Sequence, residues 1–145
     1  MKKQFSKKWK ASKQPRKQRK YLAEAFIHLR RKFLSANLSK ELRKKYSRRS
    51  FPLRKNDSVK IMRGSFKGKK GKIEKIDYKR IRVNIEGIQK SKKDGTKVKV
   101  WFAPSKLQIL ELNLDDKKRK ASLERKISSD KKEEIKKSEN KKGEK

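Results

Sequence analysis

The stretch RGSFKGKKG, residues 63–71, combines glycines with basic side chains in a way that suits phosphate binding. Glycine allows a tight turn in which backbone N–H groups approach an anion, and Lys or Arg supplies the opposite charge. The phosphate could belong to a bound nucleotide or to a nucleic-acid backbone. The nucleotide alternative fails on spacing, because Gly64 and Gly68 are too close together for a P-loop and Gly71-Lys72 is followed by Ile73 instead of Ser or Thr.

A hairpin turn without any ligand would also explain these glycines, since glycine adopts positive φ at little steric cost. We favour a turn that in addition contacts RNA phosphates. The residues expected to take part are Arg63, Gly64, Lys67, Gly68, Lys69, Lys70, Gly71 and Lys72. Phe66, in the middle of the stretch, is expected mainly to pack, with stacking on a base as the alternative.

Catalytic or metal-binding residues are not indicated elsewhere in the chain. His28 is the only histidine and there is no cysteine, so the usual zinc ligand sets and disulfides are excluded. Most acidic residues of the central part stand singly among Lys and Arg, where ion pairing is expected instead of acid–base catalysis. The sequence therefore predicts a protein that is not an enzyme and that needs no cofactor, metal or small-molecule substrate.

The net charge of +34 on 145 residues limits the possible partners. Such a charge destabilises a compact chain through self-repulsion, whereas a polyanion would neutralise it and release its own counterions. A membrane surface is a weaker alternative, because no stretch approaches the roughly 20 apolar residues of a spanning helix. The basic start of the chain also lacks the apolar region of a signal peptide, so a cytoplasmic location is expected.

Short helices are predicted in the first third of the chain, after a basic arm at residues 1–22 that is not expected to fold by itself. Phe26, Leu29 and Phe33 recur at helical spacing within residues 23–36, beside basic residues. A second helix over residues 39–47 would begin at Ser39, a good N-cap. Together these helices make up an expected helical segment at residues 23–50.

Alternating apolar residues replace the helical pattern at residues 51–112 and predict short strands. The alternation is found at Val59 and Ile61, at Ile81, Val83 and Ile85, and at Val98, Val100 and Phe102, with Leu107, Ile109 and Leu110 expected to close the sheet. Ile73 and Ile76 are three apart, which indicates a bulge in their strand. This part is expected to be a small barrel or sandwich, and the charged tail at residues 113–145 to be largely disordered.

Residues 56–88 resemble a KOW motif, with the best match in the glycine-rich turn and the strands around it. The matching positions are Asp57, Val59, Ile61, Gly64, Lys67-Gly68, Gly71-Lys72-Ile73, Val83 and Gly87. KOW motifs occur in ribosomal proteins and in transcription elongation factors. The flanks, from HLRRKFLSANLSKELRKKYS to VKVWFAPSKLQILELN, resemble the archaeal and eukaryotic branch of the large-subunit ribosomal protein 24 family, and the compact loop is similar to that of archaeal members.

This resemblance implies an SH3-like barrel bound to large-subunit rRNA, with a role in early subunit assembly near the peptide exit tunnel. The implied partners are large-subunit rRNA and the ribosomal proteins that neighbour the tunnel. Two alternatives stay open: a KOW transcription factor that contacts RNA polymerase, and a nucleoid protein that condenses DNA. In both ribosomal and transcription proteins the motif itself would look the same, so the flanks decide between them.

Further rRNA contacts are expected outside the loop. Arg30, Arg31 and Lys32 are expected to touch a second RNA segment, and Arg48, Arg49, Arg54 and Lys55 to line the entry to the barrel and anchor the helical segment. The arm, with Arg16 and Arg19, is expected to run between RNA helices and to become ordered on binding. Lys106 completes the set; many archaeal relatives carry Asn at its position, whereas eukaryotic members have Lys.

Overall fold

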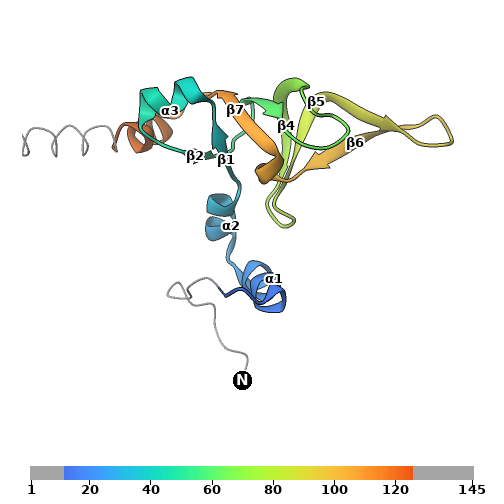
Figure 1. Cartoon of the computed structure of the whole chain (residues 1–145), viewed down its shortest axis with the longest axis horizontal. Coiled ribbons are helices and arrows are strands. Elements are labelled where there is room, and N and C mark those ends of the chain that lie inside the picture. The colour runs from blue at the N-terminus through green and yellow to red at the C-terminus, as the bar shows by residue number, and fades with distance from the viewer. Residues whose placement is uncertain (1–11, 126–145) are drawn as a thin grey trace, which may run out of the picture.

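The computed structural model describes residues 12–125, which form a strongly twisted mixed sheet with helices at its margins (Figure 1). Within these residues the sheet has seven strands in the order β2-β1-β7-β3-β4-β5-β6. The strands are β1 (Ser35–Leu38), β2 (Ser50–Pro52), β3 (Ser58–Ile61), β4 (Lys70–Asp77), β5 (Arg82–Ser91), β6 (Lys97–Phe102) and β7 (Leu107–Glu111). All neighbours are antiparallel except β1 and β7, and the predicted mainly β fold with a small SH3-like barrel is confirmed.

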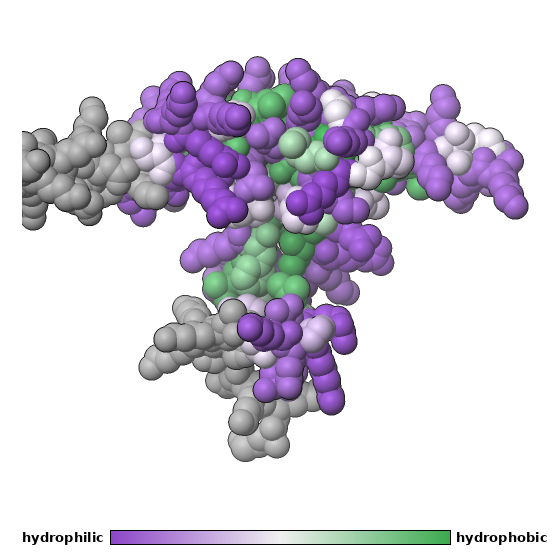
Figure 2. Space-filling view, in the orientation of Figure 1, coloured by the Kyte–Doolittle hydropathy of each residue, from purple (hydrophilic) through white to green (hydrophobic). Residues whose placement is uncertain are grey.

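The helices are short and leave the barrel in two directions. They are α1 (Pro15–Glu24), α2 (Ile27–Phe33), α3 (Lys40–Tyr46), the 3₁₀ turn η1 (Pro104–Lys106) and a helical stretch over residues 117–125. Figure 1 shows α2 and then α1 extending below the sheet like a stalk, while the β5–β6 hairpin projects to one side. The hydropathy view shows apolar surface on this stalk, where Phe26 and Ile27 are exposed (Figure 2).

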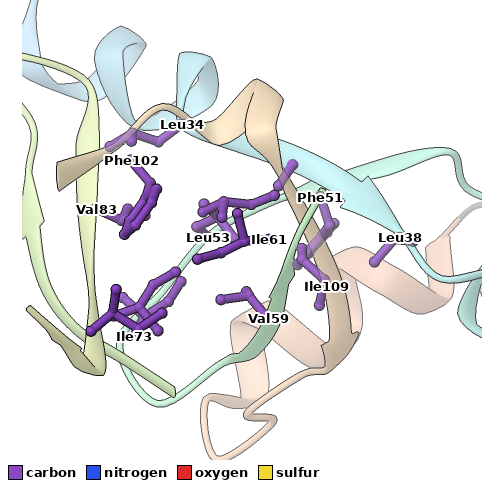
Figure 3. Close-up of a cluster of buried hydrophobic side chains, with 14 of the residues drawn as sticks. Leu34, Leu38, Phe51, Leu53, Val59, Ile61, Ile73, Val83, Phe102 and Ile109 are labelled. Carbon is purple, nitrogen blue, oxygen red and sulfur yellow. The ribbon is translucent and has the colours of Figure 1, made fainter. Parts of the chain in front are cut away.

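One hydrophobic core lies inside the barrel, and the alternating residues of the strands build most of it. Val59 and Ile61 of β3, Val83 and Ile85 of β5, and Leu107 and Ile109 of β7 are all buried. Figure 3 shows Val59, Ile61, Val83 and Ile109 gathered with Leu34, Leu53, Ile73 and Phe102 between the strands, and Ile85 and Leu107 belong to the same cluster. The predicted bulge is confirmed as well, because the β4–β5 register shifts between Ile73 and Lys75.

The helix predicted over residues 23–36 is wrong at both ends. Ala25 and Phe26 have extended backbones that separate α1 from α2, and Ser35–Leu38 form β1 instead of helix. β1 pairs with both β2 and β7 and buries Ala36 and Leu38, so strand pairing outweighs the weak local helix preference. The second helix agrees with its prediction, since Ser39 Oγ accepts a hydrogen bond from the N–H of Leu42 at 3.3 Å.

Residues 15–24 form α1 within a segment that was expected to be mostly an arm. Pro15 starts the helix, yet none of its residues is buried. Arg30 of α2 stabilises the C-terminal end of α1, because its guanidinium donates hydrogen bonds to the carbonyls of Ala23 at 2.6 Å and Ala25 at 2.8 Å. A cation at the C-terminal end of a helix also interacts well with the helix dipole. The part of the arm before residue 12 lies outside the described residues.

The tail at residues 113–145, which was expected to be largely disordered, is described by the structure as far as residue 125. Leu123 is completely buried and belongs to the barrel core, and Arg119 is 4% exposed. The sequence indicated neither burial, because isolated Leu and Arg residues in a Lys-rich tail give no pattern of a buried face. The rest of this tail, residues 126–145, lies outside the described part of the chain.

Gly71 lies in β4 where no side chain would fit, unlike the glycines of the preceding turn. A Cβ atom at this position would lie 2.7 Å from Ile85 Cγ2 and 3.0 Å from the carbonyl oxygen of Glu86, both on β5. Gly64 and Gly68 instead have positive φ angles of 96° and 89°, with open space around them. The glycines of the motif therefore serve two different physical needs.

We expect Gly71→Ala to destabilise the barrel by about 1–3 kcal/mol, because the added methyl group overpacks the β4–β5 contact. Urea unfolding followed by circular dichroism measures the change. Lys72→Ala, on the neighbouring exposed position of β4, is the matched control and should change stability little. Equal midpoints for the two variants would contradict the overpacking argument.

Candidate nucleic-acid interface

The loop between β3 and β4 is a closed turn that holds its lysine side chains outward. Its backbone N–H groups are largely used within the turn, since Lys67 donates to Gly64 O at 3.0 Å, Gly68 to Ile61 O at 2.8 Å and Lys69 to Phe66 O at 3.2 Å. These three N–H groups already have acceptors within the protein, so they are not available to bind an anion as expected. The cationic side chains that remain exposed for a phosphate on the loop and at the start of β4 are Arg63, Lys67, Lys69, Lys70 and Lys72.

Phe66 fixes this loop to the barrel. Its ring meets the ring of Phe102 edge-on, with centroids 6.0 Å apart at 88°, and it is packed against the core. The Lys69 ammonium lies 5.4 Å from the Phe66 ring centroid. These contacts favour the packing role over stacking on an RNA base.

Lys106 lies beside the loop, although it is far from it in sequence. The N–H of Met62, the residue before Arg63, donates to the carbonyl oxygen of Lys106 at 2.8 Å. The 3₁₀ turn η1 thus attaches the start of the loop to the chain before β7. The structure brings together Lys106 and the glycine-rich loop, two parts of the predicted set that sequence alone could not join.

A second group of predicted residues surrounds an open cavity at the other end of β3 and β4. Arg31 and Lys32 come from α2, and Arg54 and Lys55 from the connection between β2 and β3. Tyr78 of the β4–β5 turn lies under Arg31, whose guanidinium carbon is 5.4 Å from the ring centroid. The predicted residues therefore lie on at least two surfaces, the loop and the wall of this cavity.

Several of the predicted arginines hold the protein itself together. Arg30 donates to the carbonyl of Lys79 at 3.1 Å in addition to its bonds at the end of α1. Arg48 donates to the carbonyl of Ser122 at 2.6 Å and lies over the Phe51 ring. Arg54 forms an ion pair with Asp116. Arg48 and Arg54 thus hold the segment after β7 to the rest of the protein, whereas the expected anchoring of the helical segment stays a prediction.

Three further predicted residues are exposed and belong neither to the glycine-rich loop nor to the cavity wall. Arg16 and Arg19 are on α1, and Arg49 precedes β2. No contact in the described part of the chain shows what these three side chains bind. Their role in binding RNA stays a prediction.

The buried ion pair between Asp57 and Arg119 was missed by sequence reasoning. Arg119 Nη1 lies 2.6 Å from Asp57 Oδ1 and Nη2 lies 2.7 Å from Oδ2, a two-point contact with both side chains out of solvent. Asp57 also accepts the backbone N–H groups of Arg54 at 2.8 Å and Asn113 at 3.0 Å. Ion pairing was expected of Asp57 as of the other acidic residues in the central part, but nothing distinguished Arg119 from the basic residues around it as its partner.

Several of the other carboxylates lie in ion pairs or turns: Glu74 pairs with Lys99 and Asp116 with Arg54, while Asp77 and Asp94 accept N–H groups within turns. A hydrogen bond from Lys99 lowers the pKa of Glu74, and one from the Arg54 side chain lowers the pKa of Asp116. Among residues 12–125 there is no group of three or more His, Asp or Glu side chains arranged to hold a metal ion. Within the same residues no helix has the length and apolar character needed to cross a membrane.

A small β-barrel with exposed lysines on a glycine-rich loop defines a class, that of basic KOW-type barrel proteins. Residues 12–126 match the family model that describes the eukaryotic ribosomal proteins L26 and their archaeal counterparts, the ribosomal proteins L24. The chain belongs to this family, and the predicted archaeal and eukaryotic branch is confirmed.

Two relatives have the name large ribosomal subunit protein uL24. The protein from Methanosphaera stadtmanae is 47% identical over 116 residues, which are 80% of this chain and 99% of the relative. The protein from Korarchaeum cryptofilum is 50% identical over 115 residues, which are 79% of this chain and 88% of the relative. Both similarities extend well beyond the KOW motif into its flanks.

We expect Arg119→Met to destabilise the protein by about 3–5 kcal/mol, because it leaves the buried Asp57 carboxylate without its cation. Urea unfolding measures the loss of stability. A variant whose circular dichroism shows no folded structure would also agree with this prediction. Lys118→Met, on the neighbouring exposed position, is the control and should unfold near the wild-type midpoint. Similar midpoints for the two variants would show that the ion pair contributes little.

Proposed function

We propose that the protein is a structural constituent of the large ribosomal subunit in the cytoplasmic ribosome and binds large-subunit rRNA without catalysis. The observation that carries the proposal is the family match over residues 12–126, which covers the barrel and its flanks alike. The name of the two relatives, which span most of this chain, supports the same conclusion. A transcription factor that shared only the KOW motif would not match over both flanks.

The physical basis of rRNA binding is the exposed charge of the loop. Lys67, Lys69 and Lys70 are exposed and have no ion-pair partner within residues 12–125. Phosphates of a folded RNA would satisfy these ammonium groups and release counterions. Lys106, next to the loop, would add to the same surface.

A second RNA contact would use the basic residues at the cavity. β4 joins the two surfaces, and its eight residues span about 25 Å at roughly 3.3 Å per residue. A protein that bridges two RNA segments at this spacing would favour a folded arrangement of the RNA. That bridging is the basis for the proposed role in early subunit assembly, near the peptide exit tunnel and beside the ribosomal proteins there.

Affinity for rRNA should fall steeply with salt. If about eight phosphates are contacted, the dissociation constant should rise about a thousand-fold between about 50 and about 200 mM salt. Filter binding of the full chain to large-subunit rRNA measures this slope. A flat profile would contradict binding through phosphates.

Changing Lys67, Lys69 and Lys70 together to Glu should abolish rRNA binding, because the loop then repels the phosphates it should attract. Circular dichroism should show an intact barrel, since all three side chains are exposed. The matched control reverses the same amount of charge at the β5–β6 hairpin with Lys90, Lys92 and Lys93, also exposed, and should weaken binding much less. Equal losses in both variants would mean that total charge, and not the loop, determines binding.

Sedimentation of the tagged protein in high salt tests the proposed location. Co-sedimentation with the large ribosomal subunit is the expected result. Co-purification with RNA polymerase, or a preference for duplex DNA over folded rRNA in competition, would support one of the two alternative functions instead.

A further inference from the structure

An open cavity of about 620 Å³ lies between α2, the β2–β3 connection, the β4–β5 turn and residues 113–119. This volume is within the range of roughly 300–1,000 Å³ that is usual for small-ligand sites. Its walls combine an aromatic ring, cations and a carboxylate. An exposed basic surface is enough to bind phosphate. The cavity has, in addition to its cations, an aromatic ring and acidic side chains that phosphate binding does not need.

Tyr78 forms the aromatic wall and is held in position from both sides. The turn behind it is closed by Asp77, whose Oδ1 accepts the N–H groups of Lys79 at 2.9 Å and Arg80 at 3.0 Å. Arg30 Nη1 donates to the carbonyl of Lys79 at 3.1 Å and so connects this turn to α2. The half-buried Tyr78 ring also packs against the core, with the Arg31 guanidinium 5.4 Å from its centroid, so its exposed part lies at a fixed place in the wall beside a cation.

The charges around this ring divide into paired and available groups. Arg54 and Arg119 also line the cavity, but they are paired with Asp116 and Asp57. Lys32 and Lys55 have no ion-pair partner within residues 12–125. Together with Arg31 these lysines outnumber Asp115, which is unpaired within the same residues, so the available charge is positive in balance, and it lies beside the Tyr78 ring.

Asp115 adds a carboxylate to the same wall. A carboxylate does not suit a phosphate, which it would repel. It does suit the exocyclic amino group of a base, to which it can serve as hydrogen-bond acceptor. The wall thus contains a group for each part of a nucleotide: the phosphate, the flat base and the base edge.

We propose that this cavity receives one nucleotide that is turned out of a folded RNA. Its base stacks on Tyr78 beside Arg31, its phosphate lies near Lys32 and Lys55, and an amino group on its edge donates to Asp115. Unstacked bases held by aromatic rings and guanidinium planes are the usual means by which proteins read RNA sequence. The proposal rests on the proposed rRNA binding and adds base recognition to it. An acidic segment of a neighbouring protein would use the lysines but neither the ring nor Asp115.

Ultraviolet cross-linking of the full chain to large-subunit rRNA, followed by mass spectrometry, tests the proposal. We expect a single-nucleotide adduct on Tyr78. Tyr78→Phe keeps the stacking ring and should keep both the adduct and the affinity. Tyr78→Leu should lose the adduct and weaken binding about tenfold, equal to about 1.4 kcal/mol, within the range measured for base–aromatic stacking.

The double variant Lys32→Gln and Lys55→Gln provides a test that does not alter the half-buried ring. It should keep the fold and lower the slope of log affinity against log salt by about one for each phosphate contact that is lost. An unchanged slope would overturn the phosphate part of the proposal.

The outcomes separate the cavity from rRNA binding as a whole. If the wild-type chain does not bind rRNA, the proposed function fails. If it binds, but adducts form only on the β3–β4 loop and Tyr78→Leu binds as tightly as Tyr78→Phe, the cavity proposal alone is overturned. Cross-linking of Lys32 or Lys55 to a protein segment in assembled subunits, with no adduct on Tyr78, would overturn it in favour of an acidic protein partner.

Discussion

The two-point ion pair between Asp57 and Arg119 joins parts of the chain that no strand pairing connects. Asp57 stands at the entry to β3, and Arg119 lies in the helical stretch after β7. Arg119 also donates to the carbonyls of Pro52 and Asn113, and its guanidinium lies 5.4 Å from the Phe51 ring centroid. A buried pair of this kind tolerates the loss of neither partner, because the charge left behind is costly. Docking of the last helix, and with it burial of Leu123, therefore depends on this contact.

Arginine and lysine serve different purposes in this strongly basic chain. Arg30, Arg48 and Arg119 donate to main-chain carbonyls within the protein, which suits a planar guanidinium with several fixed donors. The lysines of the β3–β4 loop remain exposed, as flexible point charges that fit phosphates of any orientation. The net charge of +34 thus overstates the surface available for RNA, because part of the positive charge stabilises the fold.

The features that could be predicted from the sequence are those that residues close together in the chain determine. Alternation in β3, β5 and β7, the Ser39 cap and the bulge after Ile73 were all visible, because each is determined by residues close in the chain. β1 was missed although Leu34, Ala36 and Leu38 alternate, since the basic helical pattern before them was stronger. Arg119 and Leu123 could not have been found, because their burial arises only when the end of the chain returns to the barrel.

The pairing of β3 with β4 explains why the predicted residues divide between two surfaces. The chain enters β3 from Arg54 and Lys55, turns at the loop, and returns along β4 to Tyr78, so the loop and the cavity lie at opposite ends of one antiparallel pair. Paired strands with a common core do not change their length, and Arg30 connects α2 to the return turn. An RNA that contacts both ends must therefore present its phosphates at the spacing of the hairpin. Specificity for a folded RNA then follows from geometry, even where the contacts themselves are with phosphates that carry no sequence information.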